Sequence, residues 1–328
     1  LNMSESADSA IIVGGGIIGI ACAHYLSEAG YRVTVIDQGE IGRACSHGNL
    51  GMVCPSHVLP LTEPGAVAEG LRSLFNPGAA FRVKPQLRPA LLQWMLQFAL
   101  RCNHGQMLRA GQQLVPILAS SMAEYRRLFA AGLEGEWKEN GLFYVFRSPQ
   151  ALEKFAATDR LLQEHYGLAA RRIEGAELTA FEPALKEGLA GGYIYQDDGS
   201  VRPDVLIRNW VDRLAAEGVE FLSGCQMTTL RKSGGRIDAL ETGRGVLQAD
   251  HYVFAAGAWS RLLGKVLGCR LPVEPGKGYS LTMSRPEVAP RCPFLCPEHR
   301  VGATPGVGGG RLGSMMEVAG FDESIPER

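Results

Sequence analysis

A glycine-rich turn between an apolar strand and a helix constrains this chain more than any other feature. Residues 9–13 (SAIIV) are typical of a short buried strand, and the run GGGIIG at positions 14–19 follows directly. A helical pattern then extends to Gly30, and residues 31–36 (YRVTVI) predict a second strand. The segment therefore predicts a βαβ unit whose helix begins at a G-x-G-x-x-G turn.

This turn has the residue types that a dinucleotide site needs. Gly14 permits the tight turn, and Gly16 lets the backbone approach a pyrophosphate at the helix N-terminus, where free N–H groups favour anions. Gly19 allows the helix and strand to pack closely, and Asp37, after the second strand, can accept hydrogen bonds from a ribose. The alternative interpretation is a βαβ unit whose glycine turn binds nothing.

NAD and FAD proteins share this motif, so the sequence that follows has to separate them. A compact NAD domain would continue with strands and helices directly after Asp37, but here a polar loop at 43–53 (RACSHGNLGMV) intervenes. The second half of the nucleotide domain returns only near residue 204. The return contains three short strand candidates, at 226–231, 236–241 and 245–248, and a further strand at 252–254. A split unit that contains such a meander favours FAD.

Composition excludes several other classes of protein. Lys and Arg number 33 against 34 Asp and Glu, so a net charge of −1 gives no electrostatic reason to expect nucleic acid. Apolar residues make up 46% and charged residues 20%, which argues against disorder and coiled coil. The 41 glycines exceed the usual share of roughly 7% without a collagen period, so they are expected in turns, close packing and ligand loops.

Cysteine usage and the N-terminal sequence bear on the compartment. The eight cysteines include no CxxC pair, and Cys292 and Cys296 have no histidine at zinc-site spacing, so we expect reduced thiols and no metal. The apolar stretch 10–23 is interrupted by four glycines and has no basic flank, which argues against a signal peptide or a membrane span. We therefore expect a cytoplasmic protein, at most peripheral on the inner face of the cytoplasmic membrane.

Several segments together resemble the FAD-dependent oxidoreductases of the D-amino-acid oxidase and glycine oxidase superfamily, and most of all its bacterial D-amino-acid dehydrogenases. They are AIIVGGGIIGIACA with VTVID, CSHGNLGMVCPSHVLPLTEPG, YIYQDDGSVRP, GVEFLSGCQM, YVFAAGAWS, PVEPGKGYSLTM and RLGSMMEVAGFD. They follow the family's order across nearly the whole chain. The resemblance implies an α/β fold with a Rossmann-like FAD-binding domain at 9–75 and 200–270. An inserted α+β substrate domain is then expected at 76–199 and 271–328.

The resemblance also implies positions for FAD. It assigns the ADP half to Gly14, Gly16, Gly19 and Asp37, although the family usually has Glu in place of Asp37. The loop around the ribityl chain and isoalloxazine ring matches Cys45, Ser46, Gly48, Asn49, Gly51 and Met52. Met227 matches the adenine contact, and Ala256 and Gly257 match the turn that passes the pyrophosphate.

Two relatives' features are not matched by this loop. The histidine that holds FAD covalently in some relatives would align with Gly48, not with His47, so we expect non-covalent FAD. The carboxylate-binding arginine of sarcosine-oxidising relatives would align with Gly51, which argues against a close sarcosine oxidase.

Candidate substrate residues lie outside the nucleotide motif. His57, in CPSHVLP, follows the flavin loop and is either a substrate contact or a structural histidine. Tyr279, in GKGYS, is either a hydrogen-bonding partner of the substrate or an aromatic of a pleated sheet, and Lys277 is interpreted as a turn cap. The helix expected at 90–100 is apolar nearly all round, which predicts burial, with contact to a membrane surface or a quinone as the alternative.

The resemblance implies oxidation of the Cα–N bond of a D-amino acid, with D-proline-like substrates among the candidates. The expected products are an imine and then a 2-oxo acid, with electrons passed to a quinone or other respiratory-chain acceptor, in amino-acid catabolism. The flavin would carry the redox step, while the protein orients the substrate in a dry pocket. The alternatives are an oxygen-using glycine or secondary-amine oxidase, a NAD-dependent Rossmann dehydrogenase, and a flavin binder without turnover. Relatives also continue beyond the position of ESIPER into a tail that carries a carboxylate-binding arginine, so this chain is expected to be a fragment or to lack that arginine.

Overall fold

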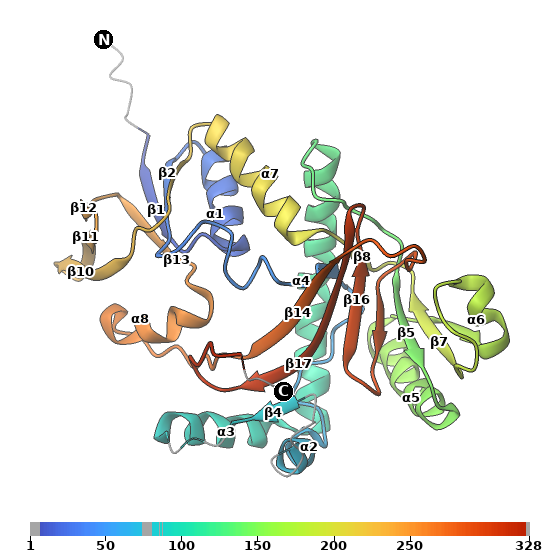
Figure 1. The fold of residues 1–328 in the computed structure, drawn as a ribbon. Helices are drawn as coiled ribbons and strands as arrows, with labels where there is room; N and C mark the ends of the chain where they lie inside the picture. The colour runs from blue at the N-terminus through green and yellow to red at the C-terminus, as the bar shows by residue number, and fades with distance from the viewer. Residues whose placement is uncertain (1–6, 74–80, 85, 87, 326–328) are drawn as a thin grey trace. The chain divides into compact units, whose positions relative to one another are not determined.

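The computed structural model describes residues 7–73, 81–84, 86 and 88–325 (Figure 1). The chain divides into two compact units by its internal contacts. Unit 1 comprises Leu1–Asn49, Leu133–Gly135 and Pro203–Val273, and unit 2 comprises Leu50–Gly132, Glu136–Arg202 and Glu274–Arg328. Each unit therefore combines segments that lie far apart in the sequence.

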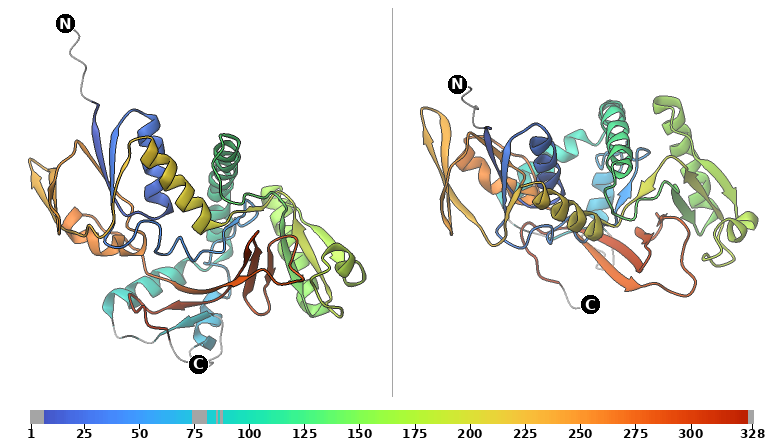
Figure 2. Two further views of the ribbon diagram at one scale, coloured as in Figure 1. Left: turned by 45° about the horizontal axis from the view of Figure 1, so that its top comes forward. Right: turned by 90° about the horizontal axis from the view of Figure 1, so that it is seen from above.

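Unit 1 is built on a four-stranded parallel sheet. Its strand order is β13 (His251–Phe254), β1 (Ser9–Val13), β2 (Arg32–Ile36) and β9 (Glu220–Leu222). The βαβ crossover is α1 (Ile17–Glu28), and α7 (Pro203–Ala216) leads into β9 and lies beside α1 in the views of Figures 1 and 2. Ile12, Ile20 and Leu214 are fully buried between sheet and helices, so the apolar run of β1 is explained by cover on both faces.

A three-stranded antiparallel meander follows β9 in unit 1. It consists of β10 (Met227–Ser233), β11 (Arg236–Thr242) and β12 (Gly245–Leu247), close to the three predicted strands. Leu240 of the meander packs with Ile11 and Ile36 of the parallel sheet. A short helical turn, η1 (Gly257–Trp259), and α8 (Ser260–Leu267) come after β13.

Unit 2 is built on an eight-stranded mixed sheet. The hydrogen-bonded order is β14 (Lys277–Ser284), β17 (Gly309–Val318), β16 (Val301–Pro305), β15 (Phe294–Cys296), β5 (Leu142–Phe146), β7 (Gly191–Tyr195) and β6 (Arg171–Glu174). The eighth strand, β4 (Phe81–Val83), pairs with the end of β17. A separate two-stranded pair joins β3 (Met52–Val53) to β8 (Gly199–Ser200).

Helices cover the two faces of the β5–β7 region. Phe143 of β5 lies in a core cluster with Leu178 of α6 (Gly175–Phe181), whereas Phe146 lies in one with Leu152 of α5 (Pro149–Tyr166). Odd and even positions of β5 therefore face different helices, as the alternation of side chains along a strand requires. The other helices of this unit are α2 (Ala66–Ser73), α3 (Pro89–Arg101) and α4 (His104–Ala130).

Helix α4 begins at His104, because the Asn103 side chain accepts a hydrogen bond from the Gln106 N–H at 3.0 Å and caps that start. The burial predicted for the helix at 90–100 needs correction. The helix predicted at 90–100 is not buried all round. It packs through one face at Leu91, while one stripe on another face, Leu92, Leu96 and Leu100, is 55%, 61% and 70% exposed. Among the described residues, no helix is long and apolar enough to cross a membrane.

Residues 50–73 also lie in a different unit from the domain predicted for them. Residues 50–73, expected with the nucleotide half, belong to unit 2, because Met52 pairs with Ser200 and Val58 is fully buried in a cluster with Leu162. The predicted boundary at 75 and 76 lies outside the described residues.

Candidate functional site

The carboxyl ends of β1 and β13 meet at the glycine turn of unit 1. Gly14 has a φ of +115°, and a Cβ there would overlap the carbonyl of Ala255. A Cβ at Gly19 would overlap the carbonyl oxygen of Gly14. The glycines are therefore required for the backbone to turn from strand to helix at this edge, where ligands of open α/β sheets bind.

Asp37 ties the second strand to this turn. Its Oδ2 accepts a hydrogen bond from the Gly15 N–H, its Oδ1 accepts one from the Gly39 N–H, both at 2.8 Å, and its carbonyl oxygen accepts one from the Cys225 N–H at 2.7 Å. A carboxylate oxygen has a further lone pair, so these bonds leave capacity for a ribose hydroxyl, and that contact stays a prediction.

The N-terminus of α1 is open toward the flavin loop. The N-cap residue is Gly16, which has no side chain to cover the first turn. Ser46 of the loop accepts a hydrogen bond from the Ile17 N–H at 3.1 Å, and a Cβ at Gly16 would lie 3.4 Å from its Oγ. A helix N-terminus without a side chain on its N-cap residue is the kind of backbone that binds anions, so this turn suits a pyrophosphate.

The other predicted cofactor residues of unit 1 lie around this turn or near it. Ala256 directly follows Ala255, whose N–H bonds the Val13 carbonyl at 2.8 Å, and Gly257 begins η1 with a φ of +54°. Met227 starts β10 close in sequence to Cys225. Cys45, Gly48 and Asn49 lie in the turns that carry Ser46.

Gly51 and Met52 belong to unit 2 instead. The Gly51 carbonyl accepts a hydrogen bond from the Val201 N–H at 2.8 Å, and Met52 pairs with Ser200. Leu50 packs over Gly302 and Gly313, where a Cβ on either glycine would lie within 2.9 Å of its side chain. The end of the flavin loop is thus fastened to the eight-stranded sheet.

Directly after this attachment, unit 2 contains a polar cluster. Ser56 donates from Oγ to Asp198 Oδ2 at 2.6 Å and from its N–H to Oδ1 at 3.0 Å, while His57 Nε2 lies 3.1 Å from the Tyr144 hydroxyl. Asp198 has no exposed surface, and desolvation raises its pKa to about 6 although the bonds from Ser56 oppose this rise. His57 is exposed on one side, yet the protein around its other sides desolvates it and lowers its pKa.

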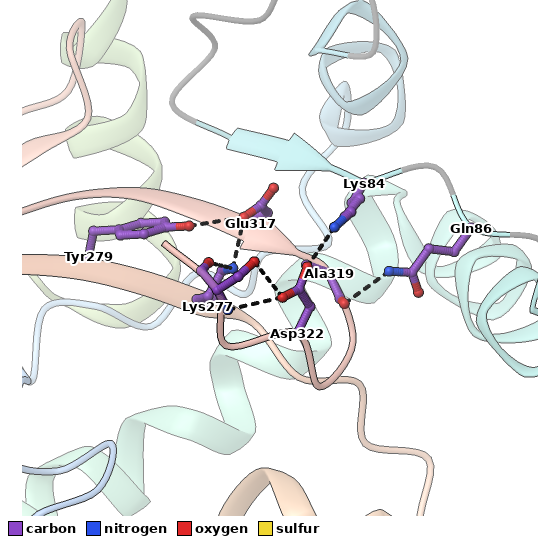
Figure 3. Close-up of polar contacts among 8 residues, drawn as sticks. Lys84, Gln86, Lys277, Tyr279, Glu317, Ala319 and Asp322 are labelled. Atoms are coloured by element: carbon purple, nitrogen blue, oxygen red, sulfur yellow. Dashed lines mark hydrogen bonds and ion pairs between the residues drawn. The ribbon is translucent and has the colours of Figure 1, made fainter. Parts of the chain in front are cut away.

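A second polar cluster surrounds Tyr279 on β14 (Figure 3). Its hydroxyl donates to Glu317 Oε2 at 3.0 Å, and Lys277 Nζ lies 3.3 Å from the same oxygen. Burial would raise the pKa of Glu317, but these two partners outweigh it and lower that pKa. Between Tyr279 and Glu317 the strand pairing shifts, with Met315 at a φ of +59° as the extra residue of a bulge. Lys277 is therefore an ion-pair partner, and its Nζ also donates to the Ser324 carbonyl at 2.8 Å, so its interpretation as a turn cap accounts for only part of its contacts.

The Lys277–Glu317 pair should contribute measurably to stability. Both side chains are mostly buried, at 17% and 10% exposed, so replacing Lys277 with Gln removes the cation beside the carboxylate and leaves the Tyr279 hydroxyl as its hydrogen-bond donor among the described residues. We expect the free energy of unfolding to fall by about 2 kcal/mol in denaturant titrations at neutral pH. The matched control is Arg231→Gln, which breaks an exposed pair with Glu241 and should cost less than about 1 kcal/mol. Equal losses in both variants would contradict the assignment.

Comparison with known proteins shows the family of this chain. Residues 9–328 match the family model described as FAD dependent oxidoreductase. The chain belongs to this FAD dependent oxidoreductase family. It is 32% identical over 323 residues to a D-amino acid dehydrogenase of Methylobacterium nodulans, covering 96% of this chain and 76% of that protein. It is 30% identical over 335 residues to one of Vibrio vulnificus, covering 97% and 78%.

Solved structures agree on the fold. The crystal structure of glycine oxidase from Geobacillus kaustophilus superposes with a TM-score of 0.69 at 21% identity, covering 98% of this chain and 75% of that one. At this identity the likeness speaks for the fold alone. The predicted fold class, α/β with a Rossmann-like FAD-binding part, is confirmed, as is the recognised superfamily.

Family membership confirms the prediction of FAD as the cofactor. The residues of unit 1 fit it, since backbone atoms approach Gly14 too closely for any side chain and Gly16 leaves the first turn of α1 without a side chain. The first turn of α1 with Ser46 would hold the pyrophosphate, and Asp37 the ribose. Tyr144 and Asp198 were not predicted. The turn signal DDG at 197–199 marked the position of Asp198, but nothing local indicated a partner at Ser56.

Proposed function

We propose that this chain is a D-amino-acid dehydrogenase, which oxidises the Cα–N bond of a D-amino acid to an imine that hydrolyses to a 2-oxo acid. The observation that carries the proposal is the relationship to proteins named D-amino acid dehydrogenase over 96–97% of this chain. The glycine turn of unit 1 supports it, because such a reaction needs a bound dinucleotide and this strand-to-helix turn suits one.

When bound, FAD supplies the acceptor for the hydride that leaves Cα. The chain's own residues then have three tasks: to hold the cofactor non-covalently, to orient the amino acid and to keep water from the reacting atoms. Gly14, Gly16 and Ser46 serve the first task. His57 and Tyr279 are proposed for the second, since each presents a hydrogen-bonding group on unit 2 that is held by a defined partner.

Bleaching of bound flavin under anaerobic conditions tests the substrate. The purified protein should show a flavin spectrum that loses its absorbance with D-amino acids and keeps it with the L-enantiomers. D-proline is included because a secondary amine distinguishes ring from open-chain substrates. A protein without flavin, or bleaching by NADH alone, would contradict the proposal, and flavin without any reduction would indicate a binding protein.

For the electron acceptor we propose a quinone or another respiratory-chain carrier. Turnover should be fast with a soluble quinone analogue and slow with oxygen. The measurement compares quinone reduction with peroxide release at equal substrate concentration. Stoichiometric peroxide in air would favour the second candidate, an oxygen-using glycine or secondary-amine oxidase, whose fold this chain shares.

A further inference from the structure

Two loops leave the carboxyl edge of the parallel sheet side by side in unit 1. One follows β2, and the other follows β9, which is the neighbour of β2 in the sheet. The Cys225 N–H donates to the Asp37 carbonyl at 2.7 Å, and the Gly224 N–H donates to the Gly39 carbonyl at 2.8 Å. The two loops therefore continue the strand pairing beyond the sheet, and we call this stretch the paired loops.

The paired loops carry a glycine on each side, so no side chain covers them there. Apart from its chain neighbours, a Cβ at Gly39 would meet only Asp37 Oδ1, at 3.7 Å, among the described residues within 4 Å. A Cβ at Gly224 would meet only Arg244 Nη2, at 3.8 Å. Both glycines are exposed, so a flat ring can lie directly on this backbone, as glycine permits at ligand sites.

Asp37 connects the paired loops to the glycine turn. Its Oδ2 accepts a hydrogen bond from the Gly15 N–H and its Oδ1 accepts one from the Gly39 N–H, both at 2.8 Å. The turn that suits a pyrophosphate, the acid that suits a ribose and the bare backbone of Gly39 thus follow one another. Pyrophosphate, ribose and adenine follow in the same order in the ADP half of FAD, so the paired loops lie where the base is expected.

Arg244 is held beside these bare glycines. It lies in the turn between β11 and β12, and its Nη2 donates to the Ser223 carbonyl at 2.5 Å. The turn is itself tied to the loop after β9, because the Gly243 N–H donates to the Gln226 carbonyl at 3.1 Å. The guanidinium group therefore has a defined place next to Gly224.

The guanidinium group of Arg244 has donors to spare. It carries five N–H donors, and among the described residues its bond to Ser223 is its one hydrogen bond, with no ion pair. Arg231 of the same meander, in contrast, is paired with Glu241. Adenine is uncharged and has ring nitrogens that accept hydrogen bonds in its plane, so it fits a planar donor that has no carboxylate partner.

We propose that Arg244 donates a hydrogen bond to a ring nitrogen of the adenine of FAD, with the base lying on the backbone of Gly39 and Gly224. The inference goes beyond the proposed function and does not depend on the substrate, because it needs only the cofactor of the family. Arg244 is then a cofactor-binding residue that the glycine motif does not indicate. Since FMN has no adenosine, the contact also favours FAD over FMN.

Replacing Arg244 with Gln tests the contact by cofactor binding alone. We expect the dissociation constant for FAD to rise about tenfold, measured by dialysis and flavin absorbance, because a bond from a charged donor is lost. ADP, which carries the adenine without a flavin, should lose the same factor as a competitor of FAD. FMN, which has no adenine, should bind equally to variant and wild type. The matched control is Arg236→Gln, an exposed arginine at the other end of β11, which should leave all three unchanged.

Arg244→Lys separates recognition of the base from simple attraction to the pyrophosphate. Lysine keeps the positive charge, but its single ammonium group replaces the planar fork that reaches Ser223 and the base together. We therefore expect Arg244→Lys to lose FAD affinity within about twofold of the loss in Arg244→Gln.

Wild-type affinity for FAD and ADP in Arg244→Gln, or wild-type affinity in Arg244→Lys, would overturn the inference. An equal loss of FMN binding would also overturn it, because it would assign Arg244 to the phosphates or to the fold of the meander. Melting temperatures identify a variant that has failed to fold, and the other substitution at Arg244 then decides. None of these measurements uses a substrate, so a failure of the proposed dehydrogenase activity would leave their outcome unchanged.

Discussion

Replacing Gly14 with Ala should weaken FAD binding at least tenfold. The new Cβ would overlap the Ala255 carbonyl, and a φ of +115° is a conformation that residues with a Cβ rarely adopt. To relieve the overlap and the backbone strain, the strand-to-helix turn must move away from the position that suits a pyrophosphate. We expect the dissociation constant for FAD to rise at least tenfold, or about 1.4 kcal/mol, measured by dialysis and flavin absorbance.

The matched control is Gly243→Ala, in the turn between β11 and β12 of the same unit. A Cβ there meets no atom within 4 Å, and its φ lies outside the positive range, so FAD binding should be unchanged. Circular dichroism separates a loss of cofactor from a loss of fold. Wild-type affinity in Gly14→Ala would show that the turn is not the cofactor site.

The second large effect concerns pH and Asp198. Burial raises its pKa from 3.8 to about 6 in the folded protein, so between these values the folded state holds a proton that the unfolded state has lost. The free energy of unfolding therefore falls as pH rises through this window. The fall is about 3 kcal/mol in total, at about 1.4 kcal/mol per pH unit, and is complete above pH 6.

Asp198→Asn should remove this pH dependence. The Asn side chain can still accept a hydrogen bond from the Ser56 N–H and can still form one with the Ser56 hydroxyl, but it never ionises. Denaturant titrations at pH 4 to 8 give the unfolding free energy of each protein. As the pH rises over this range, the wild type should lose up to about 3 kcal/mol relative to the variant. Asp197→Asn is the control, since the neighbouring Asp197 is exposed and only weakly repels Asp198. Parallel curves for wild type and Asp198→Asn would contradict a buried, charged Asp198.

The nucleotide half could be predicted from sequence because its motif encodes backbone geometry. Gly14 and Gly19 are glycines for steric reasons that hold wherever this turn occurs, and local periodicity was enough for β1, α1 and the meander. Unit 2 offered fewer local signals. Strand β15 has three residues and exists because Phe294 pairs with Phe143, a partner that no local pattern reveals.

The candidate site likewise contains residues that the sequence could indicate and residues that it could not. His57 could be singled out from its place after the flavin loop, but Tyr144 lies 87 residues further along the chain and Asp198 lies 142 residues after Ser56. The burial predicted for the helix at 90–100 was wrong for a related reason. Its composition is apolar, yet which face is covered depends on neighbours that composition does not specify.

The strands of the parallel sheet in unit 1 are synthesised far apart in time, which affects how the chain folds during synthesis. Strands β1 and β2 leave the ribosome early, but their outer partners β13 and β9 come from beyond residue 219, and Ser9 bonds an aspartate 241 residues away. Until then both strands expose unpaired edges, while much of unit 2 has already been synthesised. The glycine turn meets its neighbour Ala255 only after β13 has been synthesised, so we expect FAD to bind late in the synthesis of the chain.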